Sequence, residues 1–240
     1  MSSTIEKIKA LNILTGNINP TIIYNEGWII RLLVIESMNE KLSIRGINFG
    51  ILANKNWSSE ALISSPFVEK NLKNREGYTH ADIILGDFTV DYNERGEVKI
   101  NESPKILGII EAKMGSNLSP GTSNAKDYNQ ASRNICCLSY VTKNKLDCEI
   151  FFIIAAPRET IEKHGIELQI ERAKILIQIR DRFKHSNIEY LPEIQSQVEK
   201  CKILSICYEE WINEILDTDV KKHLNGFYKE CILHNKIKPV

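Results

Sequence analysis

Two carboxylates and one lysine lie at the ends of two apolar segments of the sequence. Glu111 and Lys113 close the run 105–113 (KILGIIEAK), and Asp82 begins the run that continues with residues 83–85. Because side chains alternate along a strand, Glu111 and Lys113 point to the same side. We therefore expect the three groups to meet at the rim of one sheet.

These residue types suit the hydrolysis of a phosphodiester with a divalent cation. Two carboxylates and a backbone carbonyl, here that of Ala112, bind Mg²⁺ or Mn²⁺ and leave positions for water and a phosphate oxygen. The ion lowers the pKa of its water, and an ammonium such as that of Lys113 can orient this water or stabilise the pentacovalent phosphate. No other trio in the sequence has this pattern. The bland alternative is a solvated strand end with a weak surface pair of Glu111 and Lys113.

Hydrophobic patterning predicts the elements that must position these groups. Residues 25–38 (NEGWIIRLLVIESM) predict a first long helix, with Asn25 as its N-cap and Glu26 in its first turn. Trp28, Leu32 and Ile35 share one stripe of that helix. A short helix is expected around residues 59–63, and short strands forming a β-meander are expected at residues 81–85, 88–92, 97–100 and 105–113.

The second half of the sequence predicts helices alternating with strands. A helix is expected at residues 125–141, a buried central strand at 148–156 and an amphipathic helix at 167–183. The apolar face of that last helix is formed by Leu168, Ile175, Leu176, Ile179 and Phe183. A strand at 202–208 and helices near 209–216 and 219–233 follow. The fold class is therefore α/β, a mixed sheet flanked by helices.

The pattern of Asp82 followed by Glu111-Ala112-Lys113 resembles the signature of the PD-(D/E)XK nuclease superfamily. Residues 77–82 (GYTHAD) and 110–133 also look like a group of uncharacterised bacterial members of that superfamily. Ala81 stands where the name of the motif has proline. The resemblance covers residues 24–156 and implies a restriction-endonuclease-like core in the order α-β-β-β-α-β.

The resemblance also implies further site residues. Glu26 resembles a frequent extra glutamate of the superfamily, with Glu36 as the alternative if the helix register differs, and Gln130 resembles its common downstream glutamine. A Mg²⁺- or Mn²⁺-dependent nuclease acting on DNA is the implied function. The implied catalytic residues are Asp82, Glu111, Lys113, Glu26 and Gln130, and the implied metal site is Asp82, Glu111 and the carbonyl of Ala112.

Several neighbouring residues have both a functional and a bland interpretation. Gln130, Arg133 and Asn134 share one helix face. Gln130 would bind water or phosphate and Arg133 would bind phosphate, unless this is a solvated face. His80 would contact phosphate or a carboxylate, or make a structural hydrogen bond. The loop of residues 114–124, with Thr122 and Asn124 as candidate substrate contacts, is either an approach to the phosphate backbone or an ordinary connection.

Composition limits the class of protein. The 240 residues carry 31 basic and 31 acidic side chains and no formal net charge, which argues against a protein that coats polyanions but allows local contact with nucleic acid. Six cysteines without a C-x-x-C pair indicate buried thiols. No apolar run approaches the length of a membrane span. We expect a cytoplasmic protein without membrane contact.

The sequence predicts one domain over residues 1–240, with the nuclease-like core at 24–156 and a C-terminal elaboration at 157–240. A homodimer is compatible with this organisation. A second function stays open because the net charge is zero and no arm rich in Lys and Arg is evident: a module without catalysis, serving nucleic-acid binding or protein assembly.

Overall fold

The computed structural model describes residues 3–68, 76–94, 97–121, 125–184, 186 and 188–235. The helices are α1 (Thr4–Leu14), α2 (Pro20–Ile23), α3 (Glu26–Asn39), α4 (Phe49–Leu52), α5 (Gln130–Val141), α6 (Arg158–His164), α7 (Ile166–Gln169), α8 (Arg172–Phe183), α9 (Leu191–Lys200), α10 (Tyr208–Glu214) and α11 (Thr218–His234), with a short 3-10 turn η1 (Tyr92–Glu94). The strands are β1 (Ser43–Ile44), β2 (Ile47–Asn48), β3 (Asn56–Ile63), β4 (Thr79–Gly86), β5 (Phe88–Asp91), β6 (Glu97–Ile100), β7 (Ile106–Ala112), β8 (Glu149–Ala156) and β9 (Lys202–Cys207).

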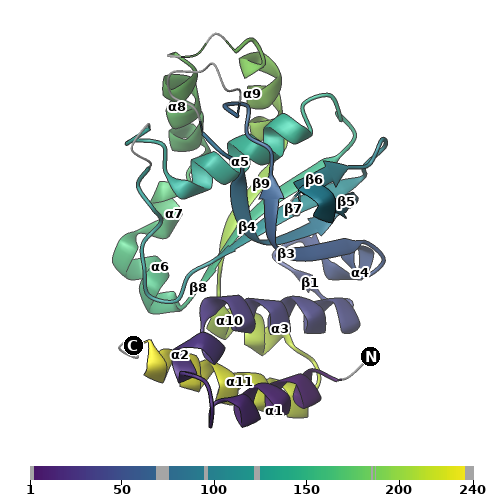
Figure 1. The fold of residues 1–240 in the computed structure, drawn as a ribbon, viewed down its shortest axis with the longest axis vertical. Helices are drawn as coiled ribbons and strands as arrows, with labels where there is room; N and C mark the ends of the chain where they lie inside the picture. The colour runs from purple at the N-terminus through teal and green to yellow at the C-terminus, as the bar shows by residue number, and fades with distance from the viewer. Residues whose placement is uncertain are drawn as a thin grey trace.

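A seven-stranded mixed sheet with the order β5-β6-β3-β4-β7-β8-β9 forms the centre of the fold (Figure 1). Strand β4 runs antiparallel to β3 and β7, whereas β7, β8 and β9 run parallel to one another. The start of β4 and the ends of β7, β8 and β9 consequently lie along one side of the sheet, and we call this row of strand ends the edge of the sheet. In α/β sheets, ligands bind outside the carboxyl ends of parallel strands, so a site is expected at this edge.

Strands β7 and β8 are buried because their sequences are apolar on both faces. Phe151 of β8 lies directly over Gly108 of β7, where an added Cβ would stand 2.0 Å from its ring. The glycine therefore allows the two strands to pack with a large ring between them. This packing fixes the register in which Glu111 lies opposite Ile154.

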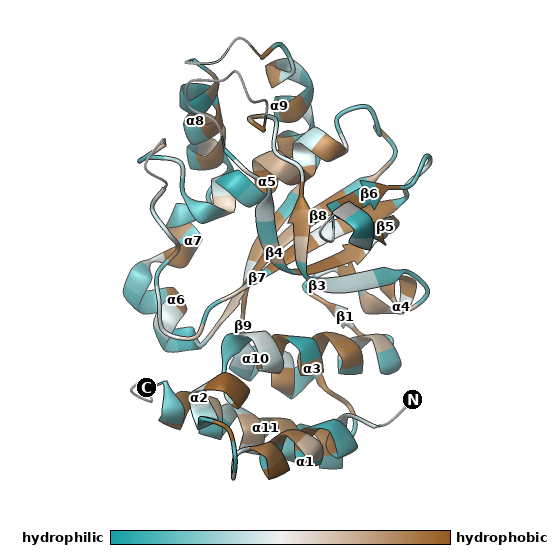
Figure 2. Ribbon diagram, in the orientation of Figure 1, coloured by the Kyte–Doolittle hydropathy of each residue, from teal (hydrophilic) through white to brown (hydrophobic). Residues whose placement is uncertain are grey.

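Helices cover both faces of the sheet (Figure 1). Helix α5 packs against α8 and α9 on one face, and α3 and α10 lie against the other, followed by a layer of α1, α2 and α11. Figure 2 shows hydrophobic residues along the sheet and more hydrophilic ones on outer helices such as α6. The two faces hold two separate apolar clusters.

Helix α11 fastens the start of α3. The Asn235 side chain donates a hydrogen bond of 2.8 Å to the carbonyl of Tyr24, and the ring of Tyr24 stacks on His234. The Asn25 side chain accepts from the amide of Trp28 and so caps α3, as the sequence predicts. The first turn of α3 is thus fixed by α11, which contacts Tyr24, and by its own N-cap Asn25.

Several predicted elements are confirmed. Helix α3 and strand β8 lie where the sequence places them, and β7, β9, α10 and α11 differ from their predictions only at their ends. Ile175, Leu176, Ile179 and Phe183 are buried as expected. The six cysteines are free and buried. No helix within the described ranges could cross a membrane.

Other predictions are wrong. Residues 59–63 form the end of β3 rather than a helix, because they pair with residues 79–83 of β4. The strands after residue 80 are not a meander, since β3 separates β6 from β4 in the sheet. Helix α5 begins at Gln130 rather than residue 125, because Asn129 caps it by accepting from the Ser132 amide. The expected helix 167–183 is two helices, and Leu168 is 58% exposed.

Candidate active site

The antiparallel register of β4 and β7 brings Asp82 and Glu111 together. Ile83 pairs with Ile110, so the next position along each strand places Asp82 beside Glu111. The Asp82 carboxylate accepts a hydrogen bond of 2.7 Å from the backbone amide of Ala112. The two acids expected at the rim of one sheet are therefore neighbours there.

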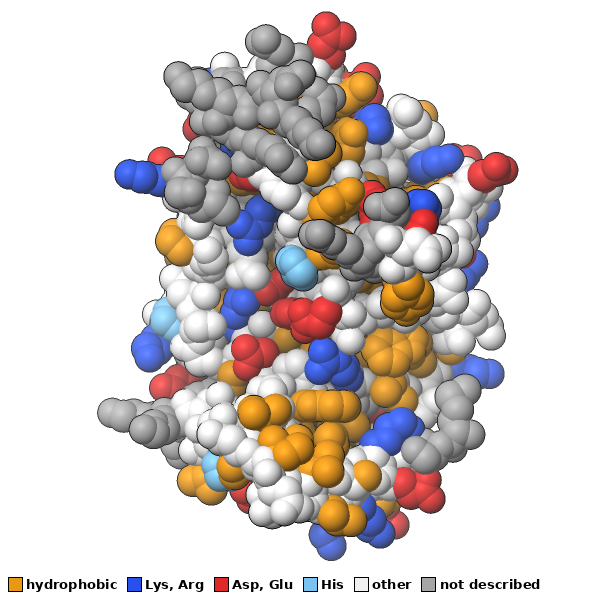
Figure 3. Space-filling view, in the orientation of Figure 1, with side chains coloured by type: hydrophobic (Ala, Val, Ile, Leu, Met, Phe, Trp, Pro, Cys, Tyr) orange, Lys and Arg blue, Asp and Glu red, His pale blue; other side chains and the backbone are white. Residues whose placement is uncertain are grey.

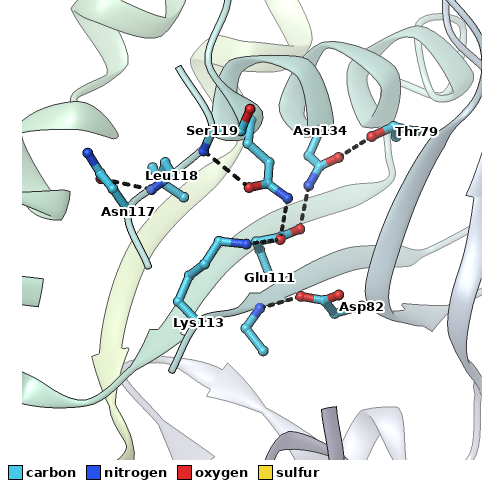
Figure 4. Close-up of polar contacts among 10 residues, drawn as sticks. Thr79, Asp82, Glu111, Lys113, Asn117, Leu118, Ser119 and Asn134 are labelled. Carbon is cyan, nitrogen blue, oxygen red and sulfur yellow. Dashed lines mark hydrogen bonds and ion pairs between the residues drawn. The ribbon is translucent and has the colours of Figure 1, made fainter. Parts of the chain in front are cut away.

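Glu111 is buried and surrounded by donors (Figure 4). Its Oε1 accepts from Lys113 Nζ at 2.7 Å and from the Gln130 side-chain amide. Its Oε2 accepts from Asn134 Nδ2 at 2.8 Å. Because Gln130 and Asn134 are one helical turn apart, the first turns of α5 present both amides to Glu111.

The environment of Glu111 favours its neutral form. Burial, together with the charge of the adjacent Asp82, raises the pKa of Glu111 from 4.5 to about 8, although Lys113 lowers it. An acid held this far above its ordinary pKa beside a second carboxylate has strong affinity for added positive charge. Such perturbed acids concentrate at functional sites.

The segment that follows β7 is fastened to two helices. The backbone amide of Lys113 donates to the carbonyl of Ala155 at 2.8 Å and extends the ladder past Glu111. Thr160 of α6 donates its hydroxyl hydrogen to the carbonyl of Met114. The backbone amide of Gln130 in α5 donates to the carbonyl of Ser119. The side chain of Lys113, with 12% of its area exposed, is consequently held at the edge of the site.

The structure distinguishes the two candidate glutamates of α3. Glu26 lies half-buried in the first turn, and its charge, like that of Asp82, raises the pKa of the Tyr208 hydroxyl. Glu36 lies ten residues further along the helix, where it accepts from the hydroxyl of Thr4 and from Asn39. Glu36 is thus engaged away from Asp82 and Glu111, and Glu26 stays the candidate acid of α3.

The remaining predicted residues have different positions. The donors to Glu111 are Lys113, Gln130 and Asn134, so Arg133 does not join them. Burial raises the pKa of Glu76, and the charges of Arg182 and Arg133 oppose this rise. His80 is exposed on β4, two residues before Asp82. Thr122 and Asn124 lie outside the described residues.

Two residues that the sequence analysis did not assign to the site support Glu111. Thr79 donates its hydroxyl hydrogen to Asn134 Oδ1 at 2.5 Å, which turns the Asn134 amide nitrogen toward Glu111. The spacing of Gln130 and Asn134 on one helix face was the available signal. Thr79 gives no sequence signal, because only the docking of α5 on β4 brings it to Asn134.

The donor types fit a cation held by few protein ligands. Asp82 and Glu111 supply two carboxylates, and Mg²⁺ is commonly bound through one or two carboxylates with water and phosphate completing its shell. Within the described part of the chain, no three His, Cys, Asp or Glu side chains are clustered as metal ligands. The two carboxylates therefore suit a cation whose remaining ligands come from water and substrate.

The surface near mid-height of the molecule has mixed charge. Figure 3 shows acidic, basic and histidine side chains gathered there, above a band of hydrophobic side chains over the lower helices. The Arg31 guanidinium of α3 pairs with Glu60 of β3 at 3.3 Å and lies over the ring of Trp28. A face with both signs of charge agrees with the zero net charge of the sequence.

The chain matches no protein-family model, no curated protein and no solved structure.

Proposed function

We propose that this protein is a metal-dependent phosphodiesterase of the PD-(D/E)XK type with a restriction-endonuclease-like core. Its substrate is nucleic acid, and DNA is the first candidate. The observation that carries the proposal is the buried Glu111, which lies beside Asp82 and Lys113 at the edge where β4 starts and β7 ends. An α-β-β-β-α-β core of the implied kind could be formed by α3, β3, β4, β7, α5 and β8, with β1, β2, α4, β5 and β6 as additions to it.

Each side chain has a definite part in this proposal. Asp82 and Glu111 would hold Mg²⁺ or Mn²⁺, and the ion would supply a water of lowered pKa and neutralise charge on the phosphate. The carbonyl of Ala112 is the third candidate ligand. Lys113 leaves Glu111 to bind the attacking water or a phosphate oxygen, a role for which an ammonium is suited.

Gln130 and Asn134 act on Glu111 directly. Their amides fix the orientation of the carboxylate from one side. Mutation of residues that orient a metal ligand in this way commonly weakens metal binding by about 10- to 100-fold. Gln130 is also free to turn toward a water or phosphate once a cation satisfies Glu111. Glu26 supports the site from α3.

The test is cleavage of single-stranded, double-stranded and branched DNA and of RNA by purified protein with Mn²⁺. Lys113→Ala should abolish most of the cleavage, because it removes the ammonium beside the scissile phosphate. Lys105→Ala is the control: it removes the charge of an exposed lysine just before the opposite end of β7 and should cleave like the wild type. No cleavage of any substrate, or full cleavage by Lys113→Ala, would refute the proposal.

A second candidate function is a module whose site no longer turns over. The observation favouring it is that Lys113, Gln130 and Asn134 together occupy both oxygens of Glu111. Calorimetry with Mn²⁺ separates the two candidates. Binding that disappears in Asp82→Ala and Glu111→Ala supports the nuclease, and no binding in the wild type supports the module.

The homodimer and the cytoplasmic location stay predictions of the sequence. Light scattering of the purified protein tests the first of them.

A further inference from the structure

Tyr208 stands at the same edge of the sheet as the candidate active site. It follows Cys207, the last residue of β9, which pairs with Ala156, while the adjacent Ala155 pairs with Ala112. Two parallel ladders therefore connect the end of β7 to Tyr208. Its side chain belongs to the apolar cluster on the α3 face, the same cluster that contains Ala112.

The ring of Tyr208 is fixed by its neighbours. It packs edge-on against the ring of Tyr228, with centroids 5.7 Å apart, and Tyr228 donates to Glu209 at 2.6 Å. Trp211 of the same helix donates to the hydroxyl of Ser37 in α3 at 2.8 Å. Helix α10 is thus locked on α3, and the direction of the Tyr208 hydroxyl is set.

The hydroxyl of Tyr208 is fully buried, and no described residue forms a hydrogen bond with it. A buried hydroxyl without a partner is unfavourable, and native proteins retain few of them. Burial raises the pKa of this hydroxyl well above its ordinary range, and the charges of Glu26 and Asp82 raise it further. The hydroxyl therefore lies within electrostatic range of two of the acids that the sequence assigns to the site.

We propose that Tyr208 is a positioning residue of this site, and that its hydroxyl donates to the Glu26 carboxylate and orients it toward Asp82 when a divalent cation is bound. The inference rests on the proposed function. Glu26 is half-buried in the first turn of α3, and no described residue forms a hydrogen bond with its side chain. Tyr208 would thereby make β9 and α10, outside the 24–156 core, part of the working site.

Tyr208→Phe tests the inference, with Tyr128→Phe as the matched control. Tyr128 also has a buried hydroxyl, next to the thiol of Cys136, but it lies in the apolar cluster on the other face of the sheet. The first readout is the Mn²⁺ affinity of each variant, measured by calorimetry. Tyr208→Phe should bind Mn²⁺ about tenfold more weakly, the size of effect typical of residues that orient metal ligands, and Tyr128→Phe should bind like the wild type.

Cleavage and stability give two further readouts. The Mn²⁺ concentration for half-maximal cleavage should rise by the same factor in Tyr208→Phe, and excess Mn²⁺ should restore the rate. The cation-free variant should be at least as stable as the wild type, because it loses only an unpaired hydroxyl. In the background of Glu26→Gln, Tyr208→Phe should weaken Mn²⁺ binding no further.

Unchanged Mn²⁺ affinity in Tyr208→Phe, equal weakening in Tyr128→Phe, or a lower melting temperature of cation-free Tyr208→Phe would each overturn the inference. The proposed function fails differently. In that case the wild type itself shows no Mn²⁺ binding that depends on Asp82 and Glu111, and the role of Tyr208 fails with it.

Discussion

The antiparallel pair β4–β7 has a buried or half-buried acid at each of its two ends, Asp87 directly after β4 and Glu111 near the end of β7, and their pKa values are shifted in opposite directions. Asp87, directly after β4, accepts from Lys55 at 2.7 Å and from the backbone amides of Lys105 and Ile106 at 2.8 and 3.2 Å. Burial alone would raise the pKa of Asp87, but these hydrogen bonds outweigh it and leave the pKa lowered. At the other end, burial and Asp82 raise the pKa of Glu111 to about 8 despite three donors.

The difference separates an acid that holds the fold from an acid that is ready for a ligand. Hydrogen bonds to Asp87 stabilise its anion and tie the loop before β7 to the end of β4. The anion of Glu111 is destabilised, because a second carboxylate stands next to it in a buried place. Ionisation of Glu111 therefore costs stability as the pH rises, and a bound cation would offset that cost if the proposed function holds.

The largest expected effect is on cleavage. Glu111→Gln should lower the rate on the order of a thousand-fold, because a lost metal ligand removes several kcal/mol of transition-state stabilisation. Asp87→Asn, the same chemical change at the other end of the β4–β7 pair, should leave the rate per folded molecule unchanged. Initial rates at saturating Mn²⁺ measure both. Equal losses in the two variants would erase the distinction between the two acids.

The next effect is on the pH dependence of stability without a cation. The pKa of Glu111 is raised in the folded state, so its contribution to stability is fully present below pH 4.5 and is lost as the pH rises to about 8. The free energy of unfolding of the wild type, relative to Glu111→Gln, should therefore fall between pH 5 and 8, by an amount on the order of a few kcal/mol.

Urea unfolding in the presence of a chelator measures this difference at each pH. Mn²⁺ should restore the stability of the wild type at pH 8 and leave Glu111→Gln little changed, because the ion binds the ionised carboxylates. If the difference in the free energy of unfolding between the wild type and Glu111→Gln does not vary with pH, the pKa of Glu111 is not raised by folding.

The smallest effect belongs to the structural acid. Asp87→Ala should reduce the free energy of unfolding by about 2 kcal/mol, because it removes hydrogen bonds to a charged acceptor and leaves two amides without it. The loss should grow smaller as the pH falls through the acid range, since the lowered pKa of Asp87 makes its contribution depend on the ionised form. Denaturation midpoints at pH 7 and pH 3 decide this, and a loss equal at both would contradict it.

The sequence predicted the elements whose signals are local. Asn25 as the cap of α3 and the apolar runs of β7 and β8 were sufficient, and strand alternation placed Glu111 and Lys113 on one side. Residues 59–63 were misjudged because their strand character comes from pairing with β4. Glu60 even has a φ of 57°, a conformation that no strand pattern would suggest.

The candidate site was predictable only where chemistry and spacing coincided. Asp82 and Glu111 could be paired because their residue types suit one metal ion. The supporting contacts of Thr79 and the position of Tyr208 depend on how α5 and α10 dock, which no local pattern encodes. Arg133 was expected on the helix face of Gln130, yet only Gln130 and Asn134 of that face donate to Glu111.

The link between Asn235 and Tyr24 joins residues 211 positions apart and has a consequence for synthesis of the protein. The ribosome delivers α3 early and α11 late, so the turn that carries Glu26 is left unfastened while the residues between them are being made. A nascent chain that already holds Asp82, Glu111 and Lys113 still lacks the clamp on Glu26. The chemistry assigned to this edge of the sheet would thus mature only after translation has passed α11.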